Sequence, residues 1–132
     1  MTKILVIEDE ETVRENILEL LDAEGFEALS AENGRIGLDL AQQQLPDLIL
    51  CDVRMPELDG YGVLTALRSE AETATIPFMF LTAKAAKTDL IYGLELGANA
   101  YITKPFTLTE LLDAIADQIG KTEQSSKNEV RI

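Results

Sequence analysis

The chain has 132 residues, 46% of them hydrophobic, and a formal net charge of −13. This length suits one folded domain and excludes a second. The negative charge disfavours direct binding to nucleic acid or to an anionic membrane, because both require positive side chains that neutralise phosphates. Without a long apolar segment or a secretory signal pattern, the sequence predicts a cytoplasmic protein that makes no membrane contact.

The first apolar run, residues 4–7, ends at Glu8 and Asp9. A helical pattern follows, with Gly25 where a C-terminal cap belongs; its apolar positions are Val13, Ile17, Leu20 and Leu21. Residues 27–31 predict a weaker strand, and their small apolar content favours the edge of a sheet. Asn33-Gly34 predicts a turn before a short helix.

The second apolar run, residues 48–51, ends at Asp52 and contains the only cysteine, Cys51. A single cysteine excludes an internal disulfide and gives no support for a thiolate metal site, so we expect a small core residue there. Proline and glycine predict a loop over 55–60, and Asp59 is placed to cap the helix that follows.

The third run, 78–81, ends at Thr82, and the fourth, 100–103, ends at Lys104-Pro105. A helix is expected between them that ends at Gly97. Thr107 and Glu110 have the spacing of a capping box for a last helix. The side chains expected to face the core from that helix are Leu108, Leu111, Leu112, Ile115 and Ile119. Residues 121–132 are polar and aperiodic, which predicts a disordered tail or a linker.

The alternation of strands and helices predicts an α/β fold, with a parallel sheet covered by helices on both faces. Short unbroken apolar runs are typical of parallel strands buried on both sides. Parallel strands share one carboxyl edge, where open α/β sheets bind ligands. The polar residues at the four run ends should therefore meet at one site.

An acidic cluster of Glu8, Asp9 and Asp52 would be strained by charge repulsion of roughly 4 kcal/mol per pair, which favours a bound cation. Oxygen ligands and the lack of histidine favour Mg²⁺. Lys104 offers an ammonium group and Thr82 a hydroxyl on the same edge. Together these groups predict an acceptor for a transferred phosphoryl group, a reaction that depends on positioning and charge neutralisation.

Each residue also has an ordinary structural interpretation. The acids at 8–11 suit the start of a helix, and Asp52 suits a turn. Thr82 suits a strand, and Lys104 suits a solvated surface. The joint placement of these residues at four strand ends favours the functional interpretation over the structural one.

Over residues 1–120, the chain resembles the receiver domain of two-component response regulators. The motifs that carry the resemblance are 4–10 (ILVIEDE), 52–56 (DVRMP), Asp59-Gly60, 80–83 (FLTA), Gly97-Ala98 and 101–106 (YITKPF). The resemblance implies a flavodoxin-like, doubly wound sheet of five parallel strands in the order 2-1-3-4-5. It also implies a signalling protein that is not a classical enzyme.

Site roles follow from the same resemblance. Asp52 would accept a phosphoryl group from a sensor histidine kinase or phosphotransfer protein. Glu8, Asp9, Asp52 and the Arg54 carbonyl would hold Mg²⁺. Lys104, followed by a cis bond to Pro105, would contact the phosphoryl group. Thr82 and Tyr101 would form the switch, which would act through the surface around the fourth and fifth helices on a downstream protein or an appended output domain.

Some positions depart from the family pattern. Glu8 replaces a frequent aspartate, and Asn99-Ala100 stands where winged-helix regulators often carry two aspartates. Asp113 and Asp117 lie where that subfamily often has arginine, so a charge-paired dimer is disfavoured and a monomer or weak dimer is expected.

In the family, the positions of Arg54 and Lys84 influence how long the phosphoryl group lasts.

Two other functions stay open. A receiver-like scaffold that binds partners without phosphorylation would keep its partner when Asp52 is replaced by alanine. A phosphatase of the haloacid-dehalogenase type would need a second acid two residues after the first, where this chain has Arg54. A dinucleotide oxidoreductase is disfavoured, because no glycine-rich fingerprint follows the first strand.

Overall fold

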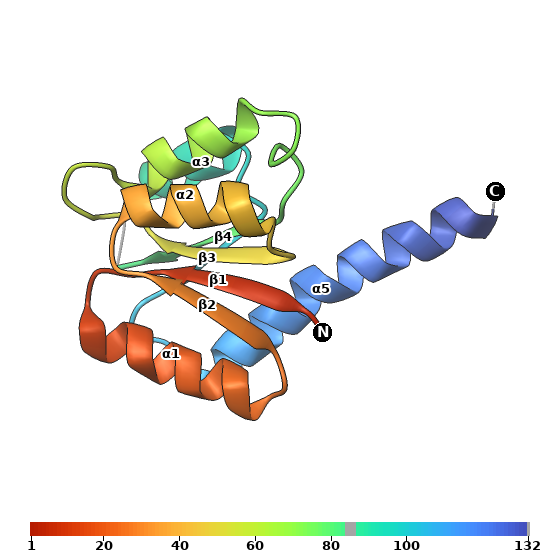
Figure 1. The fold of residues 1–132 in the computed structure, drawn as a ribbon, viewed down its shortest axis with the longest axis horizontal. Helices are drawn as coiled ribbons and strands as arrows, with labels where there is room; N and C mark the ends of the chain where they lie inside the picture. The colour runs from red at the N-terminus through yellow and green to blue at the C-terminus, as the bar shows by residue number, and fades with distance from the viewer. Residues whose placement is uncertain (84–86, 132) are drawn as a thin grey trace.

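The computed structural model describes the backbone of residues 1–83 and 87–131 and the side chains of 1–83 and 89–120. Strands and helices alternate along the whole described chain (Figure 1). The strands are β1 (Lys3–Ile7), β2 (Glu27–Ala31), β3 (Leu48–Asp52), β4 (Phe78–Thr82) and β5 (Ala100–Thr103). The helices are α1 (Glu11–Ala23), α2 (Gly34–Gln44), α3 (Gly60–Arg68), α4 (Lys87–Glu95) and α5 (Leu108–Arg131).

All strand pairs are parallel, and the sheet order is β2-β1-β3-β4-β5. The predicted α/β fold class and strand order are therefore confirmed. The register aligns the carboxyl ends of neighbouring strands: Ile7 pairs with Cys51, and Asp52 pairs with Leu81. This alignment brings the residues that follow β1, β3, β4 and β5 to the same edge.

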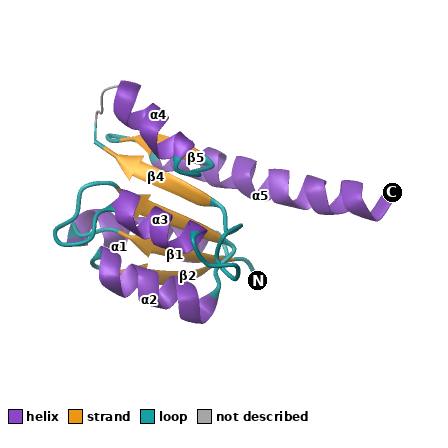
Figure 2. Cartoon of the chain, turned by 90° about the horizontal axis from the view of Figure 1, so that it is seen from above, coloured by secondary structure: helices purple, strands orange, loops and turns teal. Residues whose placement is uncertain are grey.

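Helices cover the sheet on both faces (Figures 1 and 2). Alternate strand residues point to opposite sides, so the core has two layers. On one side Ile17 of α1 and Leu111 of α5 pack against Ile4, Leu50 and other strand residues. On the other side the buried residues of α3 pack against residues such as Ile7, Cys51 and Phe80. Cys51 is a fully buried core residue, as predicted.

Capping side chains fix three helix starts. At α5 the Thr107 hydroxyl accepts a hydrogen bond from the Glu110 amide at 3.0 Å, as the predicted capping box requires. The Asp59 carboxylate accepts a hydrogen bond from the Gly62 amide at 2.9 Å, as predicted for an N-cap. The Asn33 side chain accepts from the Ile36 amide at 2.8 Å. Asn33-Gly34 is thus the cap and first residue of α2 rather than a turn, because the asparagine satisfies a free amide of the first helical turn.

Two expectations about the last part of the chain differ from the structure. β5 is an edge strand in which Tyr101 is 41% exposed, so it is not buried on both faces. Leu108 is 50% exposed because it lies at the start of α5 rather than over the sheet. α5 continues to Arg131, and the division of the chain into a domain over 1–120 and a tail over 121–132 stays a prediction. No proline follows Gly120 to stop the helix.

Candidate functional site

Three carboxylates meet at the carboxyl edge of β1 and β3. Glu8 follows β1, Asp9 is next in the chain, and Asp52 ends β3. One carboxylate oxygen from each lies within 4.8 Å of the other two. Glu8 is fully buried and Asp52 is 7% exposed, whereas Asp9 is exposed. The predicted acidic cluster therefore exists, with one member facing solvent.

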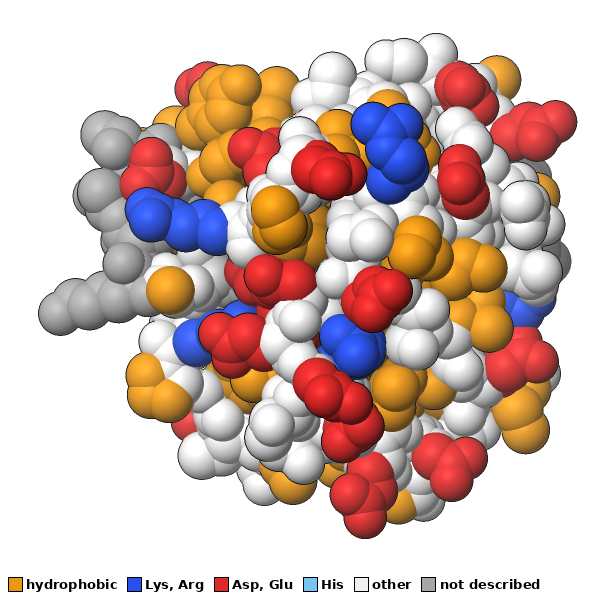
Figure 3. Space-filling model, turned by 60° about the vertical axis from the view of Figure 1, so that its left-hand side comes forward, with side chains coloured by type: hydrophobic (Ala, Val, Ile, Leu, Met, Phe, Trp, Pro, Cys, Tyr) orange, Lys and Arg blue, Asp and Glu red, His pale blue; other side chains and the backbone are white. Residues whose placement is uncertain are grey.

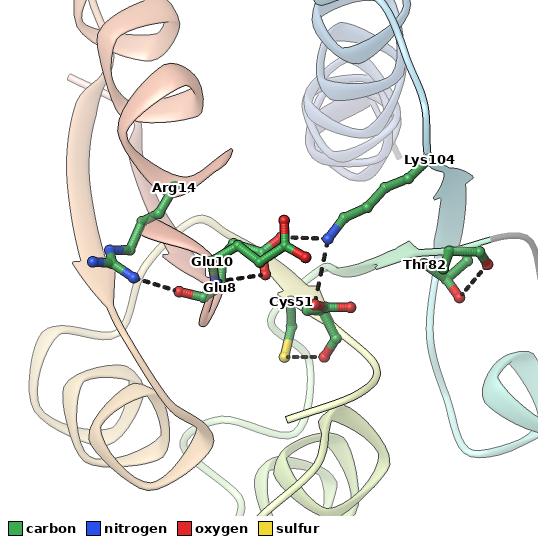
Figure 4. Close-up of polar contacts among 8 residues, drawn as sticks. Glu8, Glu10, Arg14, Cys51, Thr82 and Lys104 are labelled. Atoms are coloured by element: carbon green, nitrogen blue, oxygen red, sulfur yellow. Dashed lines mark hydrogen bonds and ion pairs between the residues drawn. The ribbon is translucent and has the colours of Figure 1, made fainter. Parts of the chain in front are cut away.

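Lys104 reaches this cluster from the end of β5 (Figure 4). Its Nζ lies 2.5 Å from Glu8 Oε1 and 3.4 Å from Asp52 Oδ2. The peptide bond between Lys104 and Pro105 is cis, the isomer that the family resemblance implies. Residues far apart in the sequence thus form one charged centre, in which the ammonium group favours Glu8 over Asp52.

Burial and the neighbouring charges both shift the pKa values of this centre. Burial, the hydrogen bond with Asp52 and the Asp52 charge raise the pKa of Glu8 to about 7, although Lys104 opposes them. Burial lowers the pKa of Lys104, but the hydrogen bonds and charges of Glu8 and Asp52 outweigh it, and the net direction is upward. Lys104 therefore stays charged, while Glu8 exchanges its proton near neutral pH.

Backbone contacts hold Glu8 in place. The guanidinium group of Arg14 donates to the Glu8 carbonyl at 2.8 Å, and the Glu10 amide lies 3.4 Å from Glu8 Oε2. Sequence reasoning did not identify Arg14 as part of the site. The available signal was that Arg14 is the only basic residue in the first helix. Glu8 is thus held at two points, at its backbone carbonyl and at its carboxylate.

The donor set suits a hard divalent cation. Carboxylate oxygens are the ligands that Mg²⁺ prefers, and it keeps several waters when few protein groups bind it. Cys51 is no competing ligand, because burial and then the charge of Asp52 raise the pKa of its thiol. Arg54 is exposed in the loop after β3, and the role of its carbonyl as a ligand stays a prediction.

The predicted switch residues are Thr82, at the end of β4, and Tyr101, in β5. The Thr82 hydroxyl donates to the Ala83 carbonyl at 3.0 Å, away from the Glu8–Lys104 pair (Figure 4). Tyr101 is 41% exposed. Both residues line a small cavity that extends to Leu90 and Leu94 of α4. Their movement on phosphorylation stays a prediction.

An open pocket of about 660 Å³ lies next to the end of β4. Its walls include Arg54, Tyr61, Thr82, Ala83 and Asp89. With the carboxyl edge of the sheet turned forward, acidic side chains are spread over the surface, with few Lys or Arg between them (Figure 3). The pocket is bounded on one side by Val53 and Arg54, which directly follow Asp52 in the chain. None of the helices in the described residues combines the length and apolar character needed to cross a bilayer.

Comparison with known proteins gives a family match and several similar proteins. A family model described as "Response regulator receiver domain" matches residues 4–116. A probable transcriptional regulatory protein of Picosynechococcus is 43% identical over 117 residues, which cover 83% of this chain and 46% of the relative. PilH of Pseudomonas aeruginosa is 38% identical over 115 residues, which cover 87% of this chain and 95% of PilH.

A crystal structure of a putative response regulator from Chloroflexus aurantiacus matches with a TM-score of 0.85 and 34% identity. The match covers 90% of this chain and 98% of that structure. The chain spans about half the length of the transcriptional regulators that it matches, but nearly the whole length of PilH.

Proposed function

The chain belongs to the response regulator receiver domain family, so it is a two-component signalling domain and not a classical enzyme, and we propose that it is switched by phosphorylation of Asp52. The donor would be the phosphohistidine of a sensor histidine kinase or phosphotransfer protein. The observation that carries the proposal is the position of the nearly buried Asp52 carboxylate, which lies close to the partly buried Lys104 ammonium group and to two further carboxylates.

In the proposed reaction, an Asp52 oxygen attacks the phosphorus atom of the phosphohistidine. The P–N bond breaks, and its electron pair goes to the imidazole nitrogen, which can take a proton from solvent. The product is an acyl phosphate on Asp52. Lys104 suits this step, because its ammonium group is 3.4 Å from Asp52 and can exchange Glu8 for a phosphoryl oxygen in a charge-assisted hydrogen bond.

Glu8, Asp9, Asp52 and the Arg54 carbonyl are the residues that would hold Mg²⁺. When bound, Mg²⁺ would neutralise charge on the phosphoryl oxygens during transfer. The chain's own contribution is to keep three carboxylates within 4.8 Å despite their repulsion. The partly buried Lys104 reduces that repulsion in the resting state.

The output would be a change in the surface formed by α4, β5 and α5. Thr82 can rotate its hydroxyl from the Ala83 carbonyl toward a phosphoryl group on the same edge. Tyr101 would follow into the cavity that both residues line. The exposed side chains of Ile91, Leu94 and Tyr101 then offer a surface for a downstream protein or an appended output domain.

The proposal also includes a cytoplasmic location and a monomer or weak dimer. The twofold longer transcriptional relatives support an appended output domain, and PilH supports a receiver that acts by protein contact. Under either arrangement, nucleic acid binding would not belong to this acidic domain.

The test is phosphorylation by a small donor. Wild type, Asp52→Asn and Asp89→Asn are incubated with Mg²⁺ and acetyl phosphate, and intact mass is measured. Asp89→Asn is the matched control, because Asp89 is an exposed carboxylate lining the neighbouring pocket. We expect one phosphoryl adduct on wild type and Asp89→Asn and none on Asp52→Asn. An adduct that persists on Asp52→Asn would overturn the assignment.

A further inference from the structure

Helix α4 is held by unusually little side-chain burial. Among the residues of α4 whose burial is described, 89–95, only Gly93 is buried, and Leu90 is partly buried. Its large apolar side chains Ile91, Tyr92 and Leu94 are 42% to 51% exposed. The position of α4 on the sheet (Figure 2) must therefore depend on a few specific contacts rather than on a broad apolar face.

The first of these contacts comes from Tyr61, at the start of α3. Its hydroxyl donates to the Asp89 carbonyl in the first turn of α4, at 3.3 Å. Its ring meets Tyr92 of α4 edge to face, with 5.0 Å between centroids, and Phe80 of β4 at 5.4 Å. Tyr61 thus joins α3, β4 and the first turns of α4.

The same aromatic group sets how closely α4 approaches the sheet. A Cβ atom at Gly93 would lie 2.8 Å from Cε2 of Phe80 and 3.6 Å from Cε1 of Tyr61. The first distance is too short for a real carbon contact, so the helix backbone rests directly on the Phe80 ring. A glycine is required here for α4 to lie this close.

The second contact comes from Arg68, at the other end of α3. Its Nε and Nη2 donate to the Gly97 carbonyl just beyond α4, at 3.2 and 3.0 Å. Nη2 also donates to Asn99 Oδ1 at 3.2 Å, and the same oxygen accepts from the Phe78 amide at 2.8 Å. A partly buried guanidinium group therefore anchors the segment that leads from α4 into β5.

The two contacts differ in strength. Hydrogen bonds from a charged donor are about twice as strong as those between neutral groups, and Arg68 makes several. Tyr61 makes a single long, neutral one. Burial, followed by the charges of Asp89 and Asp59, raises the pKa of Tyr61, so its hydroxyl keeps its proton at neutral pH. The weaker contact lies at the end of α4 nearer the acceptor site.

Tyr61 is also placed where a change at the site would reach it. It lines the open pocket together with Thr82 and Arg54. It lines the small cavity together with Thr82 and Tyr101. We propose that Tyr61 is a positioning residue that latches the first turns of α4 in the resting state, and that α4 pivots about the Arg68 contact when this latch opens. The trigger, though not the latch, rests on the proposed phosphorylation of Asp52.

The latch is tested first without any phosphodonor. Hydrogen–deuterium exchange is measured on wild type, Tyr61→Phe and Thr65→Val. Thr65→Val is the matched control, because it also removes a hydroxyl from α3, one that donates only to the Tyr61 carbonyl of the same helix. Tyr61→Phe keeps the ring and loses one neutral hydrogen bond. We expect exchange in 90–95 to become about two- to tenfold faster, with little change in 96–99.

Arg68→Lys tests the contact at the other end of α4, because lysine keeps the positive charge but lacks the forked guanidinium donor. Exchange should then accelerate in 96–99 more than in 90–95. Equal acceleration at both ends in either variant, or an unchanged α4 in Tyr61→Phe, would overturn the latch and the pivot.

The coupling to the site is tested by the rate of adduct formation from acetyl phosphate. Tyr61→Phe should react about two- to tenfold faster than wild type, because a weaker latch raises the population of the shifted state. A merely structural role would not increase the rate. Faster exchange without faster reaction would disprove the coupling. A wild type that forms no adduct would disprove the proposed function, while the exchange data would still decide the latch.

Discussion

The edge at β1 and β3 and the side of the molecule at α4 and β5 are built in opposite ways. At the first, Glu8 is fully buried and paired with Lys104. At the second, Tyr92 is 51% exposed and Tyr101 41% exposed. Disrupting a buried charged group costs several kcal/mol, but a neutral surface contact costs about one. The contacts of α4 and β5 should therefore open at a lower free-energy cost than the contacts of the buried edge.

The largest effect should come from removing the cation at the rigid edge. Lys104→Met leaves two buried carboxylates without a partner, so at pH 8 we expect a loss of about 3 kcal/mol in the free energy of unfolding. Urea denaturation without metal provides the measurement. In a Glu8→Gln background the same change should cost much less, because one of the two charges is already gone. An equal cost in both backgrounds would contradict the pairing.

The next largest effect is a pH dependence from Glu8. Its folded-state pKa of about 7 lies above its ordinary value of 4.5, so between these pH values the folded chain binds a proton that the unfolded chain has released. Metal-free wild type should therefore lose on the order of 2 kcal/mol relative to Glu8→Gln as the pH rises from about 5 to about 8. Parallel stability curves for the two proteins would contradict this prediction.

Mg²⁺ should produce a smaller stabilisation of the same edge. A ligand that binds only the folded state adds about 1.4 kcal/mol at ten times its dissociation constant. Thermal melts with and without Mg²⁺ should show this gain in wild type and in Glu11→Ala, which removes an exposed acid outside the cluster. Asp9→Ala should lose it. A normal Mg²⁺ response in Asp9→Ala would remove Asp9 from the site.

The smallest effect is expected on the loose side. Ile91 is 44% exposed, so Ile91→Ser should change the free energy of unfolding by less than about 0.5 kcal/mol. Binding to a downstream partner should weaken if this surface carries the output. A large loss of stability would show that α4 is packed more firmly than its exposure indicates.

Most of the fold was predictable because the signals for strands and helix starts are local patterns of a few residues. Apolar runs located four strands, and Asp59 marked a helix start. The errors lie where the surroundings decide. β5 was predicted from a short apolar run in the same way as β3, but it has a neighbouring strand on one side only. A run of residues contains no information about how many neighbours a strand has.

The sequence by itself determined the site's chemistry: which acids, which lysine and which hydroxyl stand at strand ends, because parallel strands must share an edge. Only the tertiary structure decided that Lys104 pairs more closely with Glu8 than with Asp52, and that Arg14, Tyr61 and Arg68 support the site and α4. Those choices depend on distances between side chains far apart in the sequence, and they are set by the packing of whole elements rather than by any local pattern.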